Sequence, residues 1–557
     1  MLNTIALLLV SSPSVAPVAL PDLLPEADFP LTVAEASGFS RSSRLDEVVQ
    51  FLDQLESLPH SGVLTRRVIG RTSEGRELIA VTAALPDGSP DRHSVVVNAT
   101  IHGGEIEGKA ATQILLRDFA LGRHHDLLEG LSITFIPVYN ADGNDAISRR
   151  NRVSQNGPTG GVGERANAMG LDLNRDFVKV EAPETRALLA LCRELRPIAF
   201  MDLHTTNGSP HGYDLTYAPS LSPNAHPGLD EYVRGNLFPG VRAELEARDG
   251  VRTFDYGIFR YPRRERGSKG KRGDPIAWNT YDSRPRFGTN LMGLRGTLSI
   301  LSEAYSYLPY RRRIEVTYAF TLECLRHIAK DRDAIASLSS ADVGFEGLEV
   351  DAQHGPSERL PVRVGSVTSQ LIDLDPDAPG EQPGRRSMAA PRDAATVVEM
   401  DVNRRFSGAR VVPTGKAWAI RNPSSELLEA LEVHLGDLAG RRLARGAEVP
   451  VKAFAIEAVS RKDSLFQGHR EVSIKGRFEA RRLALEPGTL ILPSTSLTAH
   501  LLHPESDDSL ATWNAFDGEL FPDDAASEST PTNVAATSGL TYPVLLLESM
   551  PGSLVFR

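Results

Sequence analysis

Two histidines and one glutamate in this chain have the residue types and the spacing of metal ligands. His102 and Glu105 lie three residues apart, directly after the β-branched run 95–101, and His204 directly follows a second apolar run, residues 197–203. Imidazole nitrogen and carboxylate oxygen both suit zinc, and three protein ligands leave a fourth position open, as in catalytic zinc sites. We therefore predict that His102, Glu105 and His204 bind one zinc ion per chain.

The elements that must position these residues are strands of an open sheet. In each case an apolar run ends at a glycine-containing loop, and a helical pattern follows the first of them, which is typical of a buried strand that leads into a loop and helix. Open α/β sheets bind ligands beyond the carboxyl ends of their strands. Because strands and helices alternate from residue 43 to 334, we expect an α/β fold with a mixed, mostly parallel, twisted sheet flanked by helices.

The order of three motifs resembles the zinc carboxypeptidases of the carboxypeptidase A type. The motifs are His102-x-x-Glu105, then Leu-Asp-Leu-Asn-Arg-Asp at 171–176, then Asp-Leu-His at 202–204. The resemblance covers roughly residues 40–335. It implies a carboxypeptidase-like fold and a metallocarboxypeptidase that hydrolyses the last peptide bond of a substrate with a free C-terminal carboxylate.

The resemblance also implies roles for arginine side chains. An arginine in the Gly- and Asn-rich interval 144–170 polarises the scissile carbonyl in the related enzymes, and Arg149 and Arg150 are the candidates. A guanidinium aimed at the developing oxyanion stabilises charge that appears only in the transition state. Asn174 and Arg175 are expected to hold the terminal carboxylate, since a planar guanidinium binds a carboxylate through two parallel hydrogen bonds.

A third set of expectations concerns the strand at 297–302. The resemblance implies a glutamate at this strand end as the general base, and Glu303, which follows the strand, takes that position; it would accept a proton from the attacking water and pass it to the leaving amine. Glu315 is the alternative, but it lies in a charged, helical stretch. In the related enzymes a mobile tyrosine caps the bound substrate, and Tyr281 is the candidate for that role.

Composition bounds the remaining function classes. The chain has 557 residues, which predicts two or three domains. Its net charge of −11 argues against non-specific nucleic-acid binding, and no apolar run approaches the ~20 residues of a membrane span. Cys192 and Cys324 are expected to be buried free thiols, because two cysteines in helix-like patterns form no disulfide framework or metal site.

Local composition and residue patterns divide the chain into four predicted parts. Residues 1–20 are a signal peptide or a disordered tail, and we favour export to a secreted or periplasmic location over a cytoplasmic one. The catalytic domain is placed at 21–340. Residues 341–395 contain a stretch rich in Pro, Asp, Gly and Ala and are predicted as a linker or extended loops. Residues 396–557 are predicted as a β-rich accessory domain.

Two other functions fit the same sequence. The site could hydrolyse a cell-wall peptide or another non-standard amide, and the basic segment 260–272, with seven Lys and Arg and one acid, would suit an acidic substrate. The chain could also be an inactive relative that serves as a binding module through its C-terminal part.

Overall fold

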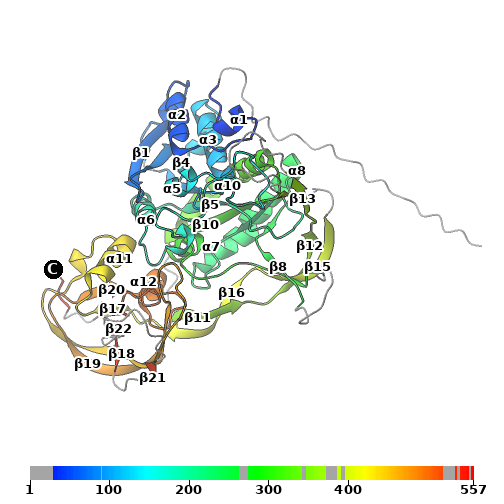
Figure 1. The fold of residues 1–557 in the computed structure, drawn as a ribbon. Helices are drawn as coiled ribbons and strands as arrows, with labels where there is room; N and C mark the ends of the chain where they lie inside the picture. The colour runs from blue at the N-terminus through cyan, green and yellow to red at the C-terminus, as the bar shows by residue number, and fades with distance from the viewer. Residues whose placement is uncertain are drawn as a thin grey trace, which may run out of the picture.

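The computed structural model describes residues 29–89, 91–262, 274–340, 347–371, 386–389, 395–517, 534–535, 540–550 and 554–556. The N-terminal segment 1–20, and residues 263–272 of the basic segment, lie outside the described residues. The described chain forms a helix-flanked sheet, a β arm beside it, and a C-terminal β unit (Figure 1).

An eight-stranded mixed sheet is the centre of the molecule, and it confirms the predicted α/β class. Its strands, in spatial order, are β1 (Leu64–Arg71), β2 (Glu77–Ala83), β4 (Leu131–Ile136), β3 (His93–Ala99), β5 (Ala199–Thr205), β10 (Leu298–Ala304), β6 (Leu215–Ala218) and β7 (Thr253–Asp255). The central strands β4, β3, β5 and β10 run parallel. The pairs β1–β2, β2–β4 and β10–β6 are antiparallel, and β7 pairs parallel with β6. Every residue of β5 and β10 is buried, as expected of strands covered on both faces.

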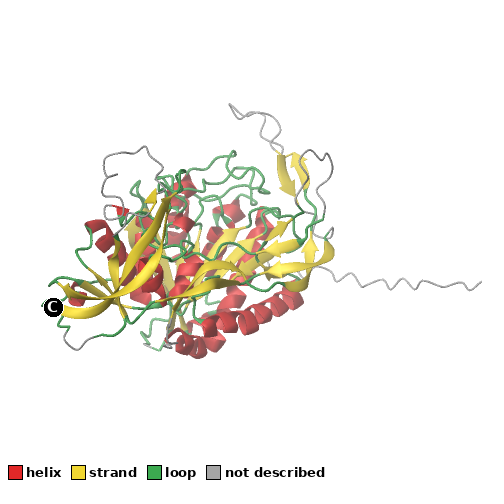
Figure 2. Cartoon of the chain, turned by 90° about the horizontal axis from the view of Figure 1, so that it is seen from below, coloured by secondary structure: helices red, strands yellow, loops and turns green. Residues whose placement is uncertain are grey.

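Helices cover both faces of this sheet (Figure 2). Alternate β3 residues point to opposite faces, so that Val95 and Val97 join one core and Val96 joins the other. The first core is packed by α2 (Leu45–Leu55), α3 (Glu107–Ala120), α8 (Phe238–Asp249) and α10 (Tyr310–Ser340). The second is packed by α6 (Pro183–Leu195) and α9 (Gly288–Leu294).

The stretch predicted as a linker or extended loops contains paired strands instead, and these strands with their partners form the β arm. β11 (Gly347–His354) pairs with β16 (Phe406–Pro413), and β12 (Glu358–Val364) pairs with β15 (Thr396–Asn403). β15 also pairs with β9 (Ala277–Asn279), which continues to β8 (Ile258–Arg260). Within the arm, β13 (Thr368–Leu371) pairs with β14 (Arg386–Ala389). Strands from before and after residue 340 therefore share a sheet. Position 396, the predicted start of the accessory domain, is the first residue of β15 and so lies inside the β arm.

The C-terminal unit is built on a second sheet. Its strand order is β19 (Val472–Leu485), β18 (Ala447–Arg461), β22 (Thr541–Leu547), β17 (Ala417–Ile420) and β20 (Leu490–Pro493), with β21 (Val534–Ala535) paired to β18. Two helices, α11 (Ser425–Leu435) and α12 (Ser496–Leu502), also belong to this unit. The second core continues from α6 and α9 into this unit, where Trp418 and Phe454 are buried.

The remaining helices are short: α1 (Val33–Ala36), α4 (His125–Leu128), α5 (Ala141–Asp145) and α7 (Pro227–Tyr232). Both cysteines are buried free thiols, as predicted. In the part of the chain that the structure describes, none of the helices is both long enough and apolar enough to cross a bilayer.

Candidate metal centre and substrate cleft

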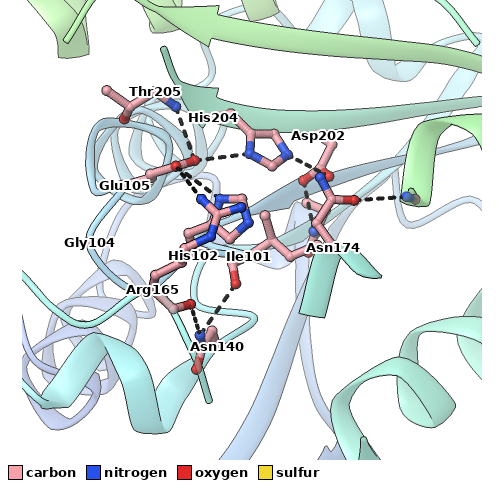
Figure 3. A network of polar contacts seen from close by, with 12 residues as sticks. Ile101, His102, Gly104, Glu105, Asn140, Arg165, Asn174, Asp202, His204 and Thr205 are labelled. Carbon is pink, nitrogen blue, oxygen red and sulfur yellow. Dashed lines mark hydrogen bonds and ion pairs between the residues drawn. The ribbon is translucent and has the colours of Figure 1, made fainter. Parts of the chain in front are cut away.

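The structure brings His102, Glu105 and His204 together at the carboxyl edge of the sheet (Figure 3). His102 and Glu105 lie in the loop between β3 and α3, and His204 lies in β5. One ligand atom from each residue falls within 4.8 Å of the other two. The loop makes a close approach at Gly103, where a Cβ atom would lie 2.2 Å from the carbonyl carbon of Gly143. Only glycine fits there, because real Cβ contacts are never that short.

The two imidazole rings are held by carboxylates on their outer nitrogens. His102 Nε2 lies 3.1 Å from Asp172 Oδ1, and His204 Nε2 lies 2.8 Å from Asp202 Oδ2. Each inner nitrogen Nδ1 lies 2.9 Å from a carboxylate oxygen of Glu105. A carboxylate that accepts the outer N–H fixes the tautomer and leaves the lone pair of the inner nitrogen for a metal ion.

These three residues fit a zinc ion. Their donor set, two imidazole nitrogens and a carboxylate, is that of a catalytic zinc site. His102 Nδ1 is buried and makes no hydrogen bond of acceptable geometry, although Glu105 Oε1 is close. A buried polar atom without a partner needs an explanation, and a metal ion between the inner atoms provides one.

The arginines that approach Glu105 are Arg152 and Arg165. Arg152 Nη1 lies 2.9 Å and Arg165 Nη1 lies 3.9 Å from Glu105 Oε1. Arg165 also donates two hydrogen bonds to Asp172 Oδ2, at 3.0 and 2.7 Å. The sequence prediction named Arg149 and Arg150, whereas the two ion pairs with Glu105 come from Arg152, whose side chain is 18% exposed, and Arg165, whose side chain is 45% exposed.

Loop packing explains this difference. Ser148 pairs with Val162, which brings the part of the loop that carries Arg149 and Arg150 back on itself. Gln155 then accepts a hydrogen bond from Arg152 Nε at 2.9 Å. The segment 149–152 alone cannot reveal which guanidinium turns inward. A usable signal was the position of Arg165, seven residues before Asp172 on a Gly-flanked segment.

Glu303 lies beside the cluster on the neighbouring strand. It is in register with His204, because β10 pairs parallel with β5. Burial raises the pKa of its carboxyl group, and the charge of Glu105 adds to this effect, whereas His204 and the two arginines oppose it. Its Oε2 atom is buried and has no hydrogen-bond partner. A carboxyl group in this setting holds a proton more readily than an exposed one.

Asn174 and Arg175 lie in a short 3-10 turn next to the cluster. Asn174 Oδ1 accepts a hydrogen bond from Gly288 N at 2.9 Å (Figure 3), which fixes the orientation of the amide. The Arg175 guanidinium stacks 4.1 Å from the centre of the Phe287 ring and donates to the Asn174 carbonyl at 2.7 Å. Because the flat face of the Arg175 guanidinium is stacked on Phe287, the N–H groups at its edge stay available to a planar anion.

Tyr281 packs against a small apolar cluster that includes Leu301 of β10, the strand that carries Glu303. Its hydroxyl group shares a hydrogen bond with Thr289 Oγ1 at 2.8 Å. The side chain lines a cavity of about 520 Å³, whose other walls include Arg284 and, from the β arm, Asp351 and Phe406. The β arm therefore forms part of the wall of the cavity that Tyr281 lines.

A buried ion pair supports the metal loop from behind. Arg313 Nε lies 3.4 Å from Glu107 Oε2, and Glu107 also accepts a hydrogen bond from the hydroxyl group of Thr205. Thr205 N in turn donates to Glu105 Oε2 at 3.1 Å. Arg313 also donates to the carbonyl of Asn156 at 2.7 Å, so one guanidinium joins α3, β5 and the arginine-bearing loop.

Comparison with known families agrees with this geometry. The model of the zinc carboxypeptidase family matches residues 48–234. This segment belongs to the zinc carboxypeptidase family. The zinc carboxypeptidase match includes the three clustered residues, Asn174 and Arg175, and it ends before Glu303.

Curated relatives align with only part of this chain. The chain is 31% identical over 153 residues to carboxypeptidase D of Drosophila melanogaster, an alignment that covers 24% of this chain and 10% of that protein. It is 33% identical over 117 residues to carboxypeptidase Z of Homo sapiens, covering 20% of this chain and 17% of that protein. The chain thus spans less than a fifth of the length of these curated relatives.

Solved structures of carboxypeptidases also match. A metallo-carboxypeptidase from Burkholderia cenocepacia matches with a TM-score of 0.39 and 17% identity, over 52% of this chain and 70% of that one. Carboxypeptidase A from Helicoverpa armigera matches with a TM-score of 0.40 and 15% identity, over 55% of this chain and 79% of that one.

Proposed function

We propose that this protein is a zinc-dependent metallocarboxypeptidase that removes the last residue of a peptide with a free C-terminal carboxylate. The observation that carries the proposal is the arrangement of the metal cluster. Two imidazoles turn their inner nitrogens toward Glu105, and each outer nitrogen faces a carboxylate. Membership of residues 48–234 in the zinc carboxypeptidase family supports the same reading.

In this proposal His102, Glu105 and His204 hold one zinc ion. Zinc at this position would supply Lewis-acid chemistry, by polarising the scissile carbonyl and lowering the pKa of water. Asp172 and Asp202 keep the two imidazoles in the tautomer that binds metal.

Glu303 is proposed to move the proton. Its carboxylate takes a proton from the attacking water and then delivers it to the nitrogen of the leaving residue. Burial favours this role, because the pKa of the carboxyl group is raised above that of an exposed glutamate.

Arg165 is proposed to donate to the carbonyl oxygen as negative charge develops on it. Its guanidinium group is already oriented by two hydrogen bonds to Asp172, so little reorganisation is needed when the substrate arrives. Asn174 and Arg175 receive the terminal carboxylate of the substrate. The amide of Asn174, with its oxygen held by Gly288, has its N–H groups to offer to that carboxylate.

The test is a comparison of wild type with Arg175→Met on two versions of one peptide, with a free-acid and an amidated C-terminus. Hydrogen bonds to a charged group contribute about 1.5–3 kcal/mol, so kcat/KM on the free acid should fall roughly 10- to 150-fold. Zinc content should stay at that of the wild type. If Arg175→Met still prefers the free acid as strongly as wild type does, the clamp is wrongly assigned.

A further inference from the structure

The turn between β18 and β19 has an unusual residue at its tip. Phe466 and His469 exchange backbone hydrogen bonds of 2.8 and 3.0 Å, which closes a two-residue turn over Gln467 and Gly468. Both central residues have positive φ, 52° for Gln467 and 84° for Gly468. Hairpin turns of this kind favour Asn, Asp or Gly at the first central position. Glutamine is disfavoured there, and strained residues of this kind gather at functional sites.

The side chain of Gln467 crosses from the C-terminal unit to Asp172, which lies beside the metal cluster. Its Oε1 atom accepts a hydrogen bond of 2.7 Å from the backbone N–H of Asp172, 295 positions earlier in the chain. Asp172 is the residue whose carboxylate holds both His102 and Arg165. The strained turn thus places an acceptor on the residue that orients a metal ligand and an arginine together.

Fixing the backbone of Asp172 also fixes the residues that follow it. Asp172 is the N-cap of the 3-10 turn Leu173–Arg175, and its Oδ1 atom accepts a hydrogen bond from Asn174 N at 3.0 Å. A movement of this N-cap would shift the carboxylate and the turn at once. One hydrogen bond from the C-terminal unit therefore restrains both the Asp172 carboxylate, which holds His102 and Arg165, and the turn that carries Asn174 and Arg175.

The turn itself is firmly anchored on the catalytic unit. His469 Nε2 lies 2.6 Å from Glu181 Oε1, and the Phe466 ring faces the guanidinium of Arg286 at 5.4 Å. Arg286 is buried and also binds Asp508, through contacts of 2.9 and 3.0 Å. These contacts flank Gln467 on both sides, so its acceptor is held in a defined place.

We propose that Gln467 is a positioning residue of the active site, so that the C-terminal unit is a working part of the metal centre. The proposal rests on the function proposed above. It assigns to Gln467 no contact with the metal ion or the substrate. Gln467 acts through Asp172, which keeps His102 in the metal-binding tautomer and Arg165 in line with the cleft.

A pair of variants in the full-length protein tests this proposal. Gln467→Asn suits the left-handed backbone at least as well as glutamine, but its shorter side chain withdraws the acceptor from Asp172. Gln467→Glu keeps an acceptor of the same reach. Leu465→Ala is the matched control, because Leu465 lies two residues away in the same loop and is 67% exposed.

The first readout is zinc affinity, measured by competition with a chromophoric chelator, and it does not depend on turnover. Removing a partner that directly touches a metal ligand lowers metal affinity roughly 10- to 100-fold. Gln467 acts one step further out, so we expect a fall of about three- to tenfold in Gln467→Asn and wild-type affinity in Gln467→Glu and Leu465→Ala. The Tm should stay near that of wild type in all three. The visible spectrum of the cobalt-substituted protein should change only in Gln467→Asn.

The outcomes separate the two proposals. If Gln467→Asn binds zinc as tightly as wild type and gives the same cobalt spectrum, Gln467 has no positioning role and the inference is overturned. If it lowers the Tm together with the zinc affinity, and Gln467→Glu fails to restore both, the residue is merely structural and the inference is again overturned. Failure of the proposed function would appear differently, as absent zinc binding or absent cleavage in the wild type itself.

Discussion

Replacing Asp172 by asparagine removes one charge from the support of the metal centre and changes its shape very little. The carboxylate faces donors on both sides, with His102 Nε2 3.1 Å from Oδ1 and Arg165 Nη2 2.7 Å from Oδ2. An amide has one acceptor oxygen and one donor nitrogen. Whichever way it turns, its NH₂ group must therefore face either the imidazole N–H or the guanidinium.

The magnitude follows from this conflict. If the NH₂ group faces His102, the imidazole gains by moving its proton to Nδ1, the nitrogen that should bind zinc. If it faces Arg165, two donors oppose each other and the guanidinium leaves its place. Partners of metal-bound histidines typically contribute roughly 10- to 100-fold in metal affinity, which corresponds to about 1.4–2.7 kcal/mol. We expect a loss of zinc affinity in this range for Asp172→Asn.

The assay is competition for zinc between the purified protein and a chelator of known affinity. Asp53→Asn is the control, because Asp53 carries the same chemistry on the surface, where its side chain is 54% exposed and pairs with Arg66. The control should bind zinc as wild type does. Asp172→Asn with wild-type zinc affinity would refute the reasoning, since the outer carboxylate would then have no part in setting the His102 tautomer.

Three further predictions concern the proton carrier, the oxyanion and the joint between the two units. Glu303→Gln should lower kcat by at least ~10²-fold, the low end for general acid–base catalysis, with unchanged zinc content by elemental analysis; near-normal turnover would remove Glu303 from the mechanism. Arg165→Lys should lower kcat roughly 10²- to 10³-fold, as loss of an oxyanion donor does, whereas Arg150→Lys should leave kcat unchanged. Steady-state kinetics with both variants decides whether Arg165 or the sequence-based candidate Arg150 stabilises the oxyanion. The hydrogen bond to Glu181 raises the pKa of His469 above its ordinary 6.5. Burial opposes the shift of Glu181, but the hydrogen bond from His469 still lowers the pKa of Glu181 from 4.5 to about 2. The pair should therefore stabilise the fold fully between about pH 4.5 and 6.5, and less as pH rises through the folded pKa of His469 or falls toward 2. Denaturation of wild type and His469→Gln should show a difference in the free energy of unfolding that narrows on the alkaline side. A difference that does not depend on pH would contradict the pairing.

Local patterns in the sequence predict the elements that carry the site. The apolar runs before His102 and before His204 correspond to β3 and β5. These elements are decided by period and by nearby Gly and Pro, which a single sequence displays. The parallel order that brings the two strand ends together then follows from general rules for α/β sheets.

Features that depend on distant partners could not be predicted in this way. The segment 341–395 has the composition of a linker, but β11 and β12 find their partners about 60 and 40 residues further on. The packing of the long loop places Arg152 and Arg165 against Glu105, and the spacing within 149–152 does not encode that placement. The contact of Gln467 with Asp172 crosses 295 positions, and only the assembled fold reveals it. The basic segment at 263–272 lies outside the described residues.

The central claim is that a zinc ion on His102, Glu105 and His204 drives removal of a terminal residue. The most direct measurement incubates the zinc-loaded wild-type protein with matched peptides, each with a free-acid and an amidated C-terminus, and reads the products by mass spectrometry. A parallel sample is first stripped with a chelator and then reloaded with zinc. The account predicts stepwise loss of residues from the C-terminus of the free-acid peptides alone, abolished by the chelator and restored by zinc. Cleavage of both peptide forms, or cleavage that survives removal of the metal, would contradict it.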